Sequence, residues 1–120
     1  METDAGGATE NEERRGYSRR PASWQAGLIY QSSKDAPPIF GTIIDVCRVG
    51  VAFVSEVPVI EKSRVVVAIR LPSEDPMKPP IEVQAEALVT SSILTRAGFR
   101  SGLHLRKFIL GQEEFLKRCP

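Results

Sequence analysis

Apolar side chains occupy every second position along two segments of this chain, and this alternation constrains the fold more than any other feature. Between residues 64 and 71 the alternate apolar positions are Val65, Val67, Ile69 and Leu71. Between residues 81 and 89 they are Ile81, Val83, Ala85, Ala87 and Val89. A period of two is typical of β-strands, whose successive side chains point to opposite faces. We therefore expect a sheet with one buried face and one face open to water.

The same period recurs in four shorter segments, at residues 24–30, 41–46, 51–55 and 99–106. Proline-containing loops are expected at residues 32–38 and 72–80, because proline lacks the N–H that a sheet requires. In the last part of the chain the period changes, and one side of a helix would carry Phe108, Ile109, Phe115 and Leu116. Six strands and a terminal helix over residues 108–118 predict an all-β fold, either a small antiparallel barrel or a sandwich.

Charge is distributed unevenly, although the formal net charge of the 120 residues is only +1. Residues 1–13 carry five acidic side chains and no basic one, and residues 14–20 carry four arginines and no acidic side chain. The first segment also lacks large apolar residues after Met1, so we expect a disordered acidic tail. We interpret residues 14–20 as a basic arm. The near-neutral total argues against a nucleic-acid polymer as partner.

The arginines of the arm suit a phosphorylated ligand. A guanidinium group presents a planar fork of donors that matches phosphate oxygens and the O6/N7 edge of guanine. A second candidate site follows at residues 45–50, between two expected strands. The Asp45 carboxylate could accept hydrogen bonds from the N1–H and N2–H groups of a guanine. The alternatives are a solvated arm that binds any polyanion and a plain hairpin turn built on Asp45 and Gly50.

Taken together and in this order, the two segments resemble the PilZ domain family, whose pattern is Arg-x-x-x-Arg followed by Asp or Asn-x-Ser-x-x-Gly. The matching residues are Arg15 and Arg19, preceded by Arg14, and then Asp45, Cys47 and Gly50, followed by Phe53. The resemblance extends from residue 14 to about residue 118. It implies a six-stranded antiparallel β-barrel with a short C-terminal helix that binds cyclic di-GMP, a bacterial second messenger.

On this resemblance, residues 14–120 form a single PilZ-like domain, with a ligand-binding arm at 14–20, a barrel at 21–107 and a helix at 108–118. The implied ligand-binding residues are Arg14, Arg15, Arg19, Asp45, Cys47 and Gly50. One departure concerns Cys47, which stands where the family usually has serine. A thiol is a weaker donor than a hydroxyl, and one lost neutral hydrogen bond costs about 1 kcal/mol, so we expect weaker binding rather than none.

The expected function is that of a receptor that changes conformation on binding cyclic di-GMP and signals through an unidentified protein partner. The alternative is a PilZ-like adaptor that binds no nucleotide and acts only through protein contacts. We expect no enzyme, cofactor or metal site, because the sequence has no Ser-His-Asp order, ligand cluster or phosphate-binding glycine loop. Neither a secretory signal nor a run of about 18 apolar residues is present, so a cytoplasmic protein without a membrane span is expected.

Overall fold

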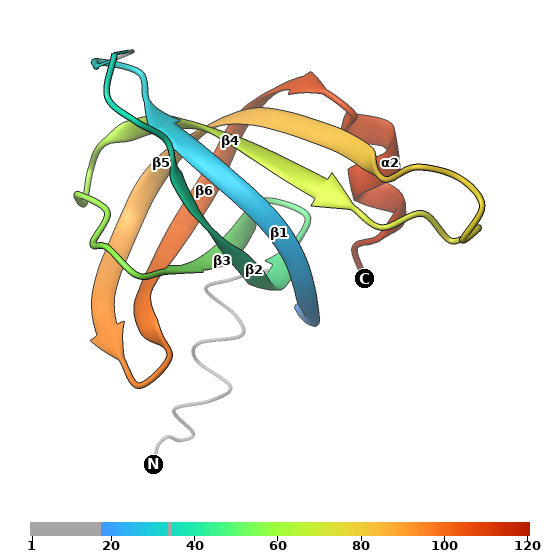
Figure 1. The fold of residues 1–120 in the computed structure, drawn as a ribbon, viewed down its shortest axis with the longest axis horizontal. Helices are drawn as coiled ribbons and strands as arrows, with labels where there is room; N and C mark the ends of the chain where they lie inside the picture. Colours follow the sequence, from blue (N-terminus) through green and yellow to red (C-terminus); the bar gives the residue numbers. More distant parts are fainter. Residues whose placement is uncertain (1–17, 34) are drawn as a thin grey trace.

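A closed barrel of six antiparallel strands forms the body of the protein (Figure 1). The computed structural model describes residues 18–33 and 35–120, so the expected acidic tail, Arg14 and Arg15 lie outside the described residues. The elements are β1 Arg20–Tyr30, β2 Ile39–Cys47, β3 Gly50–Ser55, β4 Arg64–Leu71, β5 Ile81–Thr95, β6 Gly98–Leu110 and α2 Gln112–Lys117. Around the barrel the order is β1-β2-β3-β6-β5-β4. The prediction of a six-stranded antiparallel barrel is confirmed, and a sandwich is excluded.

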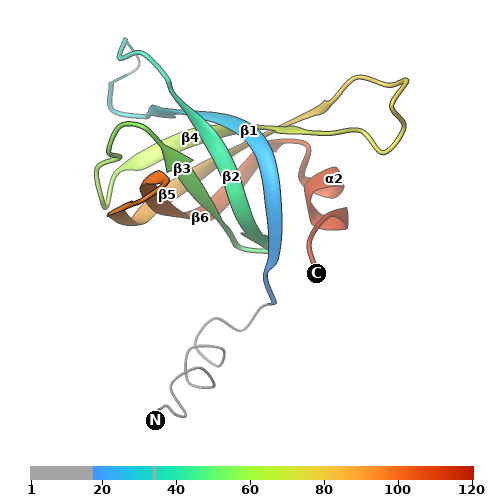
Figure 2. The same ribbon diagram turned by 60° about the horizontal axis from the view of Figure 1, so that its bottom comes forward.

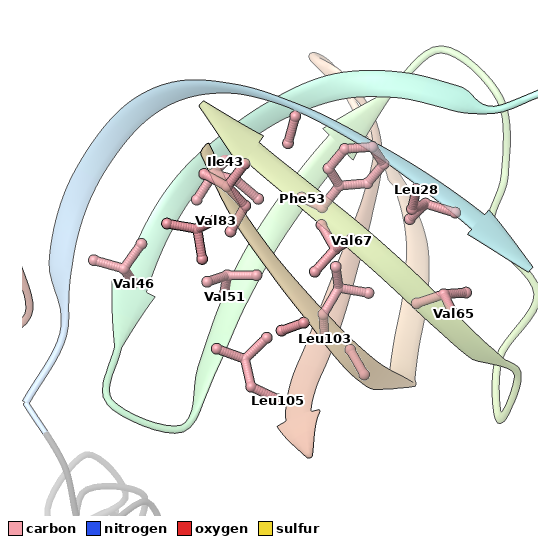
Figure 3. Close-up of a cluster of buried hydrophobic side chains, with 14 of the residues drawn as sticks. Leu28, Ile43, Val46, Val51, Phe53, Val65, Val67, Val83, Leu103 and Leu105 are labelled. Atoms are coloured by element: carbon pink, nitrogen blue, oxygen red, sulfur yellow. The ribbon is translucent and has the colours of Figure 1, made fainter. Parts of the chain in front are cut away.

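The alternating side chains fill the inside of this barrel. In β4 and β5 the apolar positions face one another across the pair, with Val67 opposite Ala85 and Ile69 opposite Val83, and all four are buried. Figure 3 shows how side chains from several strands, among them Phe53 and Leu103, converge on the same interior. Burying such residues supplies the main stabilising free energy of the barrel, on the order of 1.5–3 kcal/mol for each large side chain.

The last two strands are longer than the sequence pattern indicates. Strand β5 continues past Val89 to Thr95, and β6 begins at Gly98, so that the two form a hairpin reaching to Thr95 opposite Gly98. Three register shifts interrupt this pairing, and such bulges increase the local twist of a strand. The alternation stops at residue 89 because the side chains of residues 90–94 are exposed or only half-buried, so there is no single buried face.

The predicted start of the terminal helix at residue 108 is wrong. Residues 108–110 continue β6, where Phe108 lies opposite Ala85 and Leu110 opposite Gln84, and the helix begins only at Gln112. The chain turns at Gly111, which has a φ of 80°, a conformation that favours glycine. A Cβ atom at Gly111 would also lie 2.8 Å from the Glu82 carbonyl oxygen. The pattern of residues 108–116 thus combines a strand end with a short helix.

Helix α2 packs against the barrel beside the start of β1 (Figure 2). The fully buried Phe115 meets Trp24 edge to face, with ring centroids 6.5 Å apart, and meets Phe108 at 5.4 Å. A guanidinium nitrogen of Arg20 donates to the Arg118 carbonyl oxygen at 2.8 Å. The prediction that a short terminal helix packs on the barrel is confirmed. The helix therefore contacts β1, the strand that follows the basic arm.

Replacing Phe115 by alanine should lower the free energy of unfolding by about 3–5 kcal/mol, since the ring is fully buried between Trp24 and Phe108. Urea denaturation followed by Trp24 fluorescence measures this loss. The matched control is Ile109→Ala, because that side chain is 52% exposed and should change stability by about 0.5 kcal/mol or less. A cost below about 1 kcal/mol for Phe115→Ala would show that the helix does not hold the barrel.

Candidate functional site

The second candidate motif lies on the hairpin formed by β2 and β3. Cys47 pairs directly with Gly50, so the turn consists of Arg48 and Val49 alone, and Asp45 pairs with Ala52. A bulge between Ile43 and Asp45 shifts the register of β2, and a bulge redirects the side chains that follow it. Asp45 therefore presents its carboxylate to arginine side chains, whereas the next residue, Val46, is buried in the core.

A plain hairpin turn does not account for these two residues. Asp45 precedes the turn and bonds side chains rather than turn backbone. Gly50 is a strand residue whose backbone is not left-handed. Among the described glycines, only Gly98 and Gly111 have a positive φ. Its lack of a side chain serves close packing instead, because a Cβ atom there would lie 3.0 Å from the Leu103 carbonyl oxygen of β6. The backbone of β6 therefore lies close to β3 at this glycine.

Asp45 is the centre of an ion cluster that joins the arm to the barrel. A guanidinium nitrogen of Arg19 donates to Asp45 Oδ2 at 3.0 Å, and a guanidinium nitrogen of Arg100 on β6 lies 3.8 Å from the same oxygen. Both arginine side chains are 42% exposed and Asp45 is 20% exposed. Contacts between such exposed charges stabilise a fold by about 1 kcal/mol or less. A ligand that offers new partners can therefore replace them at little cost.

A cavity of about 340 Å³ opens beside this cluster. Its lining includes Arg19 and Arg100. It also includes residues of the β2–β3 hairpin and of the neighbouring parts of β5 and β6, among them Cys47, Gly50, Ala52, Thr90, Ser91, Gly102 and His104. This volume is within the range of small-molecule sites. A larger groove of about 730 Å³ runs over the outside of β1 and β4, but none of the predicted site residues lines it. The smaller cavity is the candidate site because charged and polar groups converge there.

Cys47 connects the cavity to the C-terminal end of the chain. It is only 5% exposed, and its neighbour Cys119 donates its Sγ–H to the Phe115 carbonyl oxygen at 3.4 Å. Burial raises the pKa of the Cys119 thiol, and the nearby Cys47 raises it further, against the opposing effect of Arg48 and Arg20. The end of β2 at Cys47 therefore lies near the residues that follow α2.

Four of the six predicted site residues come together in the structure: Arg19, Asp45, Cys47 and Gly50 lie in or beside the cavity. Arg14 and Arg15 lie outside the described residues. Arg100 and Gly102 were not predicted as site residues, because they join the site through the pairing of β6 with β3 and β5. A Cβ atom at Gly102 would lie 2.9 Å from the Ser91 and Thr90 hydroxyl oxygens. The only local signal for Arg100 was its outward position in an alternating strand.

Comparison with known proteins gives a likeness of fold. No family model matches the sequence, and no curated protein matches it. Among solved structures, the chain is similar to the Bacillus subtilis inhibitor of motility (MotI/DgrA), a PilZ-domain protein, with a TM-score of 0.69 and 20% sequence identity. The likeness covers 88% of this chain and 49% of that structure, so this chain spans about half its length. The fold is PilZ-like.

Across residues 18–33 and 35–120, no three histidine, cysteine, aspartate or glutamate side chains gather in a way that could hold a metal ion. In the same part of the chain, no helix has the length and apolar character needed to cross a membrane. The groups that converge on the cavity are instead two guanidinium groups, one carboxylate, hydroxyl groups and a thiol.

Cys119 should react with iodoacetamide only at a higher pH than an ordinary cysteine, because its raised pKa delays formation of the reactive thiolate. Substituting Cys47 by serine removes one of the groups that raise this pKa, so the reaction profile should then move to lower pH. Mass spectrometry of the Cys119 peptide over a pH series measures both, with the urea-unfolded chain as reference. A folded profile that coincides with the unfolded one would contradict the assigned burial.

Proposed function

We propose that this chain is a receptor for cyclic di-GMP. The observation that carries the proposal is the 3.0 Å contact between Arg19 and Asp45. It joins the two parts of the Arg-x-x-x-Arg and Asp-x-Cys-x-x-Gly pattern, which are separated in the sequence by the whole of β1 and most of β2. Both parts meet beside one cavity of about 340 Å³. The PilZ-like fold supports the same proposal.

The chemistry of the site suits this ligand, which combines two guanines with two phosphodiester groups. The Asp45 carboxylate accepts from the N1–H and N2–H donors of one guanine. The guanidinium group of Arg19 donates to a phosphate or to the O6/N7 edge of a base. Arg14 and Arg15 enter the proposal through their match to the family pattern, and they add two more guanidinium groups. Gly50 lines the cavity and lets β3 lie close to β6 there.

In the proposed mechanism binding alone carries the signal, without a catalysed reaction or a cofactor. The ligand holds residues 14–20 against the barrel by contacting the arm and the β2–β3 hairpin at once. A ligand shifts an equilibrium only by its difference in affinity for the two states, and here the arm-bound state offers more contacts. The altered surface beside β1 and α2 is then recognised by a protein partner in the bacterial cytoplasm.

Isothermal titration of the protein with cyclic di-GMP tests the proposal. We expect heat of binding at tens of micromolar protein, and we expect Arg19→Ala to weaken binding roughly ten- to hundredfold. The reason is that one hydrogen bond to a charged group contributes about 1.5–3 kcal/mol. Lys62→Ala, which removes one positive charge from the loop between β3 and β4, is the control and should bind like wild type. Absence of heat for the wild type would overturn the proposal.

The same titration separates the receptor from the nucleotide-free adaptor. An adaptor would give no heat with cyclic di-GMP and would still capture its protein partner from a lysate. The feature that favours the adaptor is the thiol of Cys47, whereas the guanidinium and carboxylate groups at the cavity favour the receptor. The receptor is preferred because the charged groups contribute more to binding than one neutral donor.

Cys47→Ser should bind cyclic di-GMP as tightly as wild type or more tightly. The substitution places a hydroxyl, a stronger donor than a thiol, at a residue lining the cavity. The same titration measures the change, and thermal denaturation of both proteins checks that the buried position tolerates serine. A loss of more than about tenfold in affinity, with unchanged thermal stability, would show that the site depends on the thiol itself.

A further inference from the structure

Arg100 contributes a guanidinium group to this site but belongs to neither part of the sequence pattern. It lies on β6, opposite Val54 of β3 and Ile93 of β5. Its side chain lines the same cavity as Arg19 and Cys47. Its guanidinium group lies 3.8 Å from Asp45 Oδ2, the oxygen that also accepts from Arg19. One carboxylate oxygen therefore faces two guanidinium groups, one from the segment before β1 and one from β6.

This contact does not bind Arg100 firmly to Asp45. At 3.8 Å the separation exceeds that of a hydrogen bond, and the Arg100 side chain is 42% exposed. Within the described residues, the side chain that donates a hydrogen bond to the Asp45 carboxylate is that of Arg19. Strand β6 itself is held by backbone pairing to β3 and β5 on either side. Only a weak charge attraction to Asp45 therefore holds the Arg100 guanidinium, and a ligand in the cavity can replace it without breaking a hydrogen bond.

We infer that Arg100 is an additional anion-binding residue of this site, and that Asp45 restrains both guanidinium groups until a guanine occupies the carboxylate. The inference rests on the proposed function and adds a determinant of specificity to it. When guanine N–H donors engage Asp45, Arg19 and Arg100 become available to the phosphate groups of the same ligand. The barrel wall then contributes one arginine to the ligand, in addition to those of the arm.

The charges of the cluster explain why this arrangement selects for guanine. In the free protein two guanidinium groups and one carboxylate give a local charge of about +1. A cyclic dinucleotide without guanine must attract the arginines in competition with Asp45, and its base offers no matching pair of donors to that carboxylate. A guanine nucleotide satisfies the carboxylate and the arginines together. Asp45 therefore lowers the affinity for anions in general and raises it for the guanine ligand.

The first test compares Arg100→Ala with Arg106→Ala by titration with cyclic di-GMP. Both substitutions remove one guanidinium group from β6, but Arg106 is exposed and lies outside the cavity lining. We expect Arg100→Ala to weaken binding roughly tenfold or more and Arg106→Ala to bind like wild type. Arg100→Lys should recover part of the loss, since it restores the charge without the fork. Unchanged melting temperatures would show that the loss is one of contact rather than folding.

The second test uses Asp45→Asn with two ligands, cyclic di-GMP and cyclic di-AMP. The substitution should weaken cyclic di-GMP binding and strengthen cyclic di-AMP binding, because it removes the charge that restrains the arginines. A structural role of Asp45 would change both affinities in the same direction. Equal or weaker binding of cyclic di-AMP by the variant than by wild type would overturn the restraining role.

The outcomes separate this inference from the proposed function. Absence of cyclic di-GMP binding by the wild type overturns the proposed function, and the inference with it. Binding by the wild type together with wild-type affinity in Arg100→Ala overturns the inference alone and leaves the receptor standing. A loss confined to Arg100→Ala, with Arg106→Ala unaffected, supports both.

Discussion

Pairing between β3 and β6 is the constraint on which the rest of the site depends. It closes the barrel between strands that are far apart in the sequence, and it sets Gly50 opposite His104 and Val54 opposite Arg100. Without this register the β2–β3 hairpin would carry Asp45 and Cys47 on an isolated ribbon, and no cavity would form behind them. The absent side chain at Gly50 matters here, because Leu103 approaches that position closely.

The closed barrel also explains which parts of the fold were predictable from the sequence. A barrel has one buried interior, so each strand needs apolar side chains on one face only, and β4 and β5 show this in their alternation. The alternation is lost where the β5–β6 hairpin has no buried face, as at Leu94. The sequence therefore does not indicate where β5 ends and where β6 begins. Phe108 and Phe115 do lie together as a helix would place them, but Gly111 brings them together by a turn. Local spacing cannot distinguish these two routes to one contact.

The residues of the candidate site also divide into those that the sequence predicts and those that only the structure brings in. Arg19, Asp45, Cys47 and Gly50 belong to two short segments, and each segment is recognisable from neighbouring residues alone. Arg100 and Gly102 belong to the site only because β6 pairs with β3 and β5, and no spacing in the sequence contains that information. The structure was also needed to explain why residue 50 is a glycine, since its backbone conformation is that of an ordinary strand residue.

The weakness of the ion cluster is consistent with a site that exchanges partners. A fully buried Arg–Asp pair would be costly to separate, since breaking it leaves an uncompensated charge away from water. The exposure of Arg19 and Arg100 avoids this cost, because water solvates each guanidinium group during the exchange. At the same time the contact with Asp45 keeps Arg19 at the cavity, which would reduce the entropy lost on binding of the proposed ligand. The cluster thus holds the arm near the barrel without binding it too firmly for a ligand to compete.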